Sequence, residues 1–386
     1  MTDLAVIIVN YNVKHYLWQC LDSVKKASVG LDVETVVVDN DSTDGSVEYL
    51  EPLFPNVKFI RAGGNLGFSK ANNKAVALTD SRYILFLNPD TIVGEKTLGD
   101  CIRFMDNHPS AGMTGVCMLN RDGTFARESR RAVPTPFVSL CKMSGLCSLF
   151  PKSRLFGRYY LGFTDISEPV RIEVISGAFM FVRREAFNRV GGFDETFFMY
   201  GEDIDLSYRV LKEGYENWYA PYRILHYKGE STNKTSYGYA KVFYNAMQIF
   251  FDKHYSTYGV LFRWLVRAAV SVQTVMSYIG HNLVGPCEYE ESGHGKWLYA
   301  GHEDRLKDVS AILNADSSNL KSVGETLPDG SAERDYTIYD VTAFSYGEIL
   351  DNLSDNAGTS VIATYNPERG IILTDSAILK GGDANA

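Results

Sequence analysis

The feature that most constrains the fold is a series of short apolar runs in the first ninety residues. Four runs, rich in β-branched and aromatic residues, occur at Leu4–Val9, Val33–Val38, Val57–Ile60 and Tyr83–Leu87. Runs of this length and composition are typical of strands that are buried on both faces of a sheet. Amphipathic helical patterns separate them, at Tyr16–Ala27, Val47–Leu53 and Ser69–Leu78. This alternation predicts an α/β fold built from βαβ units.

Polar turns follow three of these strands, at Asn10, Asp39 and Asp90. Ligands of such sheets bind outside the carboxyl ends of the strands, so we expect the three side chains on one rim. An Asp in such a turn is often only a turn former, and this interpretation stays open for Asp39 and Asp90. Alternatively, Asp90 holds a divalent cation against a diphosphate, because hard cations prefer oxygen ligands. The glycine-rich residues 63–67 fit no standard phosphate-binding loop.

A second acidic cluster, Glu202, Asp203 and Asp205, follows an aromatic stretch and Gly201. Gly201 is typical of a turn before a helix, and carboxylates in a first helical turn are favoured by the helix dipole. The cluster is therefore either the acidic start of an ordinary helix or part of a site that needs a base.

Charge divides the chain into two parts. From Glu290 onward there are 17 acidic and 7 basic residues, whereas the preceding part has 30 and 31. We therefore expect a domain boundary near residues 285–295, and the absence of a basic patch argues against nucleic-acid binding. The six cysteines have no C-x-x-C spacing, which argues against a zinc site or a disulfide framework and fits a reducing cytoplasm. The apolar run at the N-terminus begins a strand and is not typical of a signal peptide.

The pattern after residue 91 is less regular. We expect helices at Thr97–Asn107, Arg184–Val190, Ile204–Glu213 and Tyr237–Phe251, and strands at Arg171–Ile175, Phe179–Val182, Tyr215–Ala220 and from Ile224. Residues 137–160 remain either a flexible loop or a helical pair over an acceptor cleft. Residues 258–283 are apolar with Arg263, Trp264 and Arg267 among them, which indicates either an interfacial membrane helix or a packed helix.

A strand–helix pattern restarts at Lys296. Strands are expected at Lys296–Ala300, Leu320–Gly324, Thr337–Ala343, Ser360–Tyr365 and Gly370–Thr374, and helices at Arg305–Asn314 and Tyr346–Leu353. We therefore predict three units: a catalytic domain at 1–235, a helical segment at 236–289, and a small acidic α/β domain at 290–386, the C-terminal domain. The last is expected to contact a partner or the first domain.

Six motifs occur in order along the first part of the chain: VDNDSTDGS (38–46), NLGFSKANN (65–73), LNPDT (87–91), SGAFMFVRREAF (176–187), GGFDETFFMYGEDIDL (191–206) and HYKGES (226–231). Over about residues 4–232 this series resembles the family 2 inverting glycosyltransferases, in particular the bacterial rhamnosyltransferase-like branch. The resemblance implies a GT-A fold, which is a Rossmann-like nucleotide-diphospho-sugar transferase domain.

The resemblance also implies roles for individual residues. Asp203 matches the catalytic base, and Glu202 and Gly177 lie on the acceptor side. Asp90 and His226 match the ligands of Mg²⁺ or Mn²⁺, although a core histidine is the alternative for His226. Donor-binding positions are matched by Asn10, Asp39, Asn65, Asn72, Asn88 and Asp90. The family often has Asp-x-Asp at the metal position, and here Asn88 replaces the first acid.

The implied reaction transfers a sugar from a nucleotide-sugar donor, dTDP-L-rhamnose or next a UDP-hexose, to a hydroxyl of a glycan or lipid-linked acceptor. We expect a cytoplasmic enzyme in peripheral contact with the inner face of the membrane. The sequence does not decide whether the enzyme is a monomer or a homodimer. The competing hypothesis is a non-catalytic nucleotide-sugar-binding or scaffold protein of a polysaccharide assembly complex.

Overall fold

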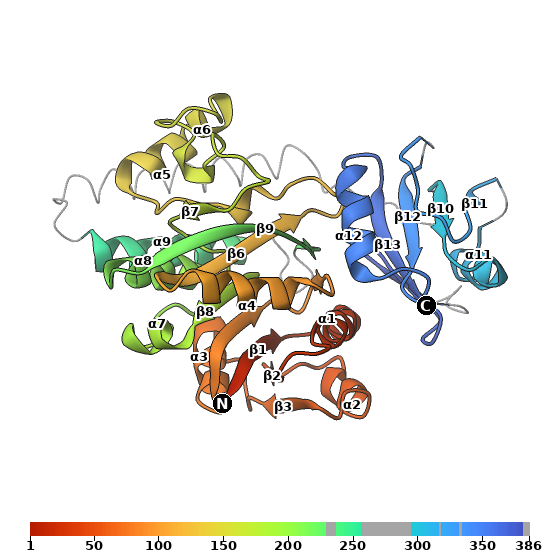
Figure 1. The fold of residues 1–386 in the computed structure, drawn as a ribbon, viewed down its shortest axis with the longest axis horizontal. Helices are drawn as coiled ribbons and strands as arrows, with labels where there is room; N and C mark the ends of the chain where they lie inside the picture. The colour runs from red at the N-terminus through yellow and green to blue at the C-terminus, as the bar shows by residue number, and fades with distance from the viewer. Residues whose placement is uncertain (229–236, 256–294, 316–317, 332–333, 381–386) are drawn as a thin grey trace.

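The computed structural model describes residues 1–228, 237–255, 295–315, 318–331 and 334–380. The expected interfacial helix at 258–283 lies outside the described residues. Within them the chain forms a nine-stranded main sheet and a six-stranded second sheet (Figure 1). The predicted class is confirmed, because a Rossmann-like main sheet of the GT-A type precedes a smaller mixed α/β unit.

The main sheet runs in the order β3-β2-β1-β4-β8-β6-β9-β5, with β7 paired beside β9. Strands β3, β2, β1 and β4 are parallel, whereas β8 runs antiparallel to both of its neighbours and β5 antiparallel to β9. The strand bounds are β1 Thr2–Asn10, β2 Val33–Asp39, β3 Val57–Arg61, β4 Ser81–Leu87, β5 Thr91–Val93, β6 Ala111–Leu119, β7 Val170–Ile172, β8 Phe179–Arg183 and β9 Glu216–His226.

Helices cover both faces of this sheet. Adjacent strand residues enter different apolar clusters: Ile7 packs in one, whereas Val6 and Ile8 pack in the other. Because the strands are buried on both faces, their sequences are nearly continuous apolar runs, and these runs predicted the strands. The helices are α1 Lys14–Ala27, α2 Ser46–Leu50, α3 Gly67–Val76, α4 Thr97–Asn107, α5 Pro136–Met143, α6 Leu146–Leu149, α7 Arg184–Arg189, α8 Glu202–Lys212 and α9 Tyr237–His254.

Three features of the main domain differ from the sequence expectations or resolve them. Strand β6 was not predicted because glycines interrupt it, yet a Cβ on Gly112 would lie 2.6 Å from Val210 on α8, so that glycine permits close packing. The two strands expected around residue 221 are one strand, β9, whose pairing with β6 shifts register there. Residues 137–160 contain the short helices α5 and α6.

The second sheet has the order β11-β10-β12-β13-β14-β15, with the first four strands parallel and the last two antiparallel. Its strands and helices are β10 Trp297–Ala300, α11 Leu306–Leu313, β11 Leu320–Ser322, β12 Tyr336–Asp340, α12 Tyr346–Asp355, β13 Val361–Asn366, β14 Ile371–Leu373 and β15 Ile378–Lys380. Figure 1 shows α12 on the side of this sheet that faces the main domain. Strand β15 was not predicted. None of the described helices is both long and apolar enough to cross a bilayer.

Candidate active site

A cavity of about 470 Å³ lies at the carboxyl ends of the central strands of the main sheet. Seven of the residues singled out from the sequence line it: Asn65, Asn88, Asp90, Gly177, Glu202, Asp203 and His226. The fold therefore brings together side chains from the ends of β4 and β9 and from the start of α8.

Asn10, Asp39 and Asn72 are buried and are not among the cavity-lining residues. Asn10 lies opposite Asp39 in the sheet, and its Nδ2 donates to Asp39 Oδ1 at 2.8 Å. The other oxygen of Asp39 accepts from the amide of Ser42, three residues later, at 3.0 Å. Asn72 donates to the carbonyl of Phe68 at 2.9 Å. In this structure, all three are engaged with the protein behind the cavity wall.

The glycine-rich turn supports the loop that leads to α8. Gly67 has a φ of +74°, and a Cβ there would lie 2.4 Å from the carbonyl oxygen of Phe198. The next residue, Phe68, donates its amide to that same oxygen at 2.8 Å. Asn40 holds the turn from the other side, because its Nδ2 donates to the Gly67 carbonyl at 3.1 Å. Only glycine permits this approach of two backbones.

Asp90 and His226 are neighbours because Thr91 on β5 lies opposite His226 on β9. His226 Nε2 is 3.3 Å from Asp90 Oδ1 and 3.2 Å from Asn88 Nδ2. A single ring nitrogen cannot accept from the amide and donate to the carboxylate at once. Where the family often has the first Asp of Asp-x-Asp, this chain has Asn88, and its side-chain amide lies beside His226.

A divalent cation fits this pair. It would take the lone pair of His226 Nε2 and an oxygen of the 2% exposed Asp90; the carboxylate suits both Mg²⁺ and Mn²⁺, whereas Mg²⁺ prefers oxygen to imidazole ligands. No cluster of three or more His, Cys, Asp or Glu side chains suited to a metal occurs within the described residues.

The Asp203 carboxylate is held by three groups. Its Oδ2 accepts from the Arg131 guanidinium, with which it forms an ion pair, and from the Gly177 amide at 3.3 Å. Its Oδ1 accepts from the Ile204 amide at 2.8 Å. Burial opposes the charge on Arg131, but the carboxylate outweighs this and raises the pKa of Arg131. Each carboxylate oxygen retains further acceptor capacity toward the cavity.

Glu202 lies beside this pair and is 7% exposed. Burial, reinforced by the negative charge of Asp203, raises the pKa of Glu202 to about 8. Its Oε2 atom has no hydrogen-bond partner among the described residues. Near neutral pH this side chain is therefore mostly a neutral acid that faces the cavity, whereas its neighbour is paired with a cation.

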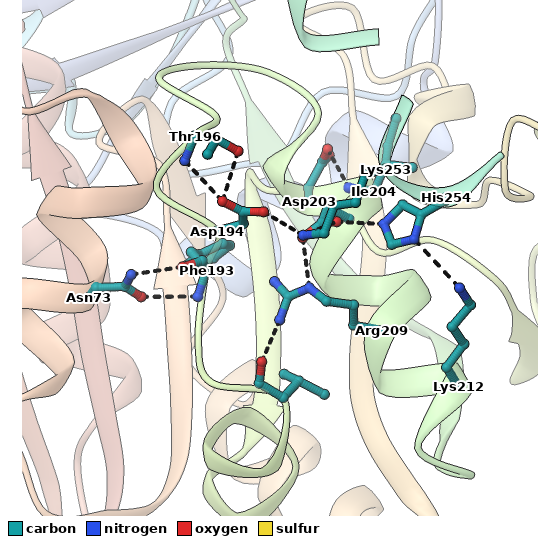
Figure 2. A network of polar contacts seen from close by, with 12 residues as sticks. Asn73, Phe193, Asp194, Thr196, Asp203, Ile204, Arg209, Lys212, Lys253 and His254 are labelled. Carbon is teal, nitrogen blue, oxygen red and sulfur yellow. Dashed lines mark hydrogen bonds and ion pairs between the residues drawn. The ribbon is translucent and has the colours of Figure 1, made fainter. Parts of the chain in front are cut away.

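A buried ionic network fixes the helix that carries these residues (Figure 2). Asp205, which is fully buried, accepts from Arg209 Nε at 2.7 Å and from His254 Nε2 at 2.6 Å. Lys253 lies 2.9 Å from the same carboxylate and also pairs with Asp194. Burial opposes ionisation of Asp205, but the hydrogen bond from His254 and the interactions with Arg209 and Lys253 lower its pKa. Helix α9 is thereby joined to α8.

Sequence reasoning missed several cavity residues. Arg131 and Glu128 belong to the polar, basic residues 120–131, for which no role was predicted, and Phe198 belongs to the aromatic stretch before the acidic cluster. The only signal for Arg131 was an arginine within a polar segment, which does not indicate a partner 72 residues away. Tyr11, beside Asn10, also lines the cavity.

Comparison with known proteins gives the family of this chain. Residues 5–191 match the model of glycosyl transferase family 2, and residues 157–232 match that of the N-terminal domain of galactosyltransferase. The chain belongs to glycosyltransferase family 2 and is a glycosyltransferase.

Its curated relatives include bacterial rhamnosyltransferases. It is 29% identical over 289 residues to the N-acetylglucosaminyl-diphospho-decaprenol L-rhamnosyltransferase of Mycobacterium tuberculosis, which covers 71% of this chain and 92% of the relative. It is 28% identical to the rhamnosyltransferase WbbL of Escherichia coli, over 58% and 82% of the two chains. A solved mannosyltransferase from Pyrobaculum calidifontis, in complex with GDP-Man and Mn²⁺, is 16% identical with a TM-score of 0.46, over 74% and 78% of the chains.

Proposed function

We propose that this protein is a metal-assisted, inverting rhamnosyltransferase that uses dTDP-L-rhamnose and acts on a lipid-linked glycan acceptor. The observation that carries this proposal is that the Asp90–His226 pair and the Asp203–Arg131 pair line one cavity. The sugar and the acceptor are inferred from the two rhamnosyltransferase relatives, and UDP-hexoses are the next donor class.

Departure of a nucleoside diphosphate leaves negative charge on the diphosphate. Asp90 and His226 would hold a divalent cation there, and the bound cation would neutralise this charge. The family resemblance places the nucleotide base at Asp39, which accepts a hydrogen bond from Asn10 at the ends of β1 and β2.

The acceptor hydroxyl is a weak nucleophile and needs a base at its own side of the sugar. Asp203 serves as that base in this proposal, because it lines the cavity as a carboxylate with acceptor capacity left. Arg131 and the Gly177 amide fix its orientation. Displacement of the diphosphate from the face opposite to the base inverts the configuration at the sugar carbon.

Protonated Glu202 has a different role from Asp203. A neutral carboxylic acid donates one hydrogen bond and accepts others, so it would orient an acceptor hydroxyl toward Asp203. This division follows from the environments of the two acids, since only Asp203 has a cationic partner among the hydrogen bonds and ion pairs of the described residues.

The proposal is tested with purified protein, Mn²⁺ and a panel of nucleotide sugars. Thermal stabilisation should be greatest with dTDP-L-rhamnose, since a ligand stabilises the fold according to its concentration relative to its dissociation constant. With N-acetylglucosaminyl-diphospho-polyprenol as acceptor, the product should carry rhamnose of inverted anomeric configuration. Transfer with retention, or no response to any dTDP- or UDP-sugar, would contradict the proposal.

A lipid-linked acceptor requires the cavity to approach a membrane surface. We propose that residues 258–283 provide this contact, on the basis of their sequence alone, with Arg263 and Arg267 attracted to anionic lipid. The protein should float with anionic liposomes, and the double change Arg263→Glu and Arg267→Glu should abolish flotation. A wild type that remains unbound at low salt would refute this contact.

A further inference from the structure

The C-terminal domain contacts the part of the main sheet that holds the candidate metal ligands. Helix α12 packs against β5 and β9, the antiparallel pair that brings Asp90 and His226 together. The carboxylate of Glu95, just after β5, accepts the amides of Tyr346 at 2.8 Å and Gly347 at 2.7 Å. These amides start α12 and have no partner within the helix, so Glu95 caps it.

The contact continues as one apolar core. The same buried cluster contains side chains from β5, β9 and α12: Ile92, Leu225, Ile349, Leu350 and Leu353. A shared core holds the two units in one arrangement, as the interior of a single domain does. The edge strand β5 is also covered by this contact, which protects its exposed backbone.

A chain of buried hydrogen bonds leads from the second sheet to the metal site. Gln19 Nε2 donates to the hydroxyl of Thr364 on β13 at 2.6 Å, and Gln19 Oε1 accepts from the hydroxyl of Tyr227 at 3.1 Å. The Tyr227 amide donates to the carbonyl of Asp90 at 3.0 Å. Tyr227 directly follows His226, so this chain contacts the backbone of one candidate ligand and adjoins the other.

A second route reaches the same end of β9. The nearly buried carboxylate of Asp375 pairs with Arg121, and the neighbouring Asn120 accepts from Lys228 Nζ. Lys228 lies two residues after His226 and also pairs with Glu128 at 3.1 Å. Glu128 lines the cavity. Two independent routes thus connect the C-terminal domain to residues that flank His226.

We propose that the C-terminal domain is a brace that positions the Asp90–His226 pair, with Thr364, Gln19 and Tyr227 as its positioning residues. No described residue of this domain is among those that line the cavity, so it acts through these contacts. The inference rests on the proposed function of Asp90 and His226 as metal ligands. It assigns the acidic domain a role in diphosphate handling, whereas the sequence suggested only a contact surface.

The test uses the full-length chain and the change Thr364→Val, which keeps the β-branched shape and removes the hydroxyl that accepts from Gln19. The matched control is Arg223→Ala, which removes the Arg223–Asp351 ion pair of the same interface, where both side chains are exposed. Tyr227→Phe, which removes only the other end of the hydrogen-bond chain, serves if Thr364→Val does not fold. The readouts are hydrogen exchange in the peptide that contains Tyr227 and calorimetric binding of dTDP with and without Mn²⁺.

The brace predicts faster exchange at Tyr227 in Thr364→Val and about tenfold weaker Mn²⁺-dependent dTDP binding, because partners behind metal ligands typically contribute this much. Metal-free dTDP binding and the Arg223→Ala control should match wild type. Exchange at Tyr227 unchanged from wild type would overturn the brace. If Mn²⁺ does not strengthen dTDP or UDP binding by wild type, the proposed metal function fails, and the exchange result alone decides the brace.

Discussion

Glu202 offers the sharpest prediction, because its environment makes the stability of the fold depend on pH. Its pKa is raised from 4.5 to about 8, chiefly by burial. Between these two values the folded protein binds a proton that the unfolded chain has released. The contribution of Glu202 to stability is therefore complete below pH 4.5 and is lost as the pH rises through about 8.

The change Glu202→Gln replaces the neutral acid by a neutral amide of the same size. One pH unit between the two pKa values corresponds to about 1.4 kcal/mol, so ionisation of Glu202 costs at most about 5 kcal/mol above pH 8. Water entering the cavity reduces this cost, so we expect about 2 to 4 kcal/mol. The variant should match wild type at low pH and be more stable at high pH.

The assay is urea unfolding of both proteins at about pH 5, 7 and 9, because the difference between them cancels the other titrating groups. Glu213→Gln, an exposed position just after α8, is the control and should show no pH-dependent difference. A stability difference for Glu202→Gln that stays constant from pH 5 to 9 would refute the raised pKa and the role of Glu202 as a neutral donor.

Two further substitutions test the supports of the site. Gly67→Ala should destabilise the fold by about 2 kcal/mol or more in chemical denaturation, because its φ is +74° and a Cβ would contact the Phe198 carbonyl. The variant should also transfer sugar more slowly. Stability equal to wild type would show that this backbone contact is dispensable. Asp205→Asn should cost about 3 to 5 kcal/mol of unfolding free energy, because it leaves Arg209 without its buried counter-charge, whereas Lys253 keeps Asp194. A loss below 1 kcal/mol, as for a surface pair, would contradict this role.

The elements that could be predicted from the sequence are those whose physics is local. Leu4–Ile8 of β1 and Val36–Val38 of β2 are buried, so their apolar runs indicated these strands directly. Gly201 and the acids after it predicted the start of α8 because left-handed glycine and the helix dipole act within one turn. The rim position of Asp90 followed from the end of its strand.

The rest depends on contacts between distant segments. Strand β6 was not predicted because Gly112 weakens the strand pattern. A glycine is needed at this position because α8, almost one hundred residues later, packs against it. The role of Arg131 depends on its contact with Asp203, and the contact of α12 with the main domain depends on Glu95. The sequence around Arg131 and Glu95 did not indicate either contact. Neither pairing changes the composition or periodicity of its own segment.

The assignment of Asp203 as the base is the central claim, and one kinetic comparison tests it most directly. Initial rates of rhamnosyl transfer are measured for wild type and Asp203→Asn, together with calorimetric binding of dTDP and Mn²⁺ to both. The amide keeps the size of Asp203 and can still accept from Arg131, but it cannot take a proton from the acceptor. The account predicts that transfer falls by about a hundredfold or more while dTDP binding is unchanged. Transfer by Asp203→Asn at a rate close to wild type would contradict the account.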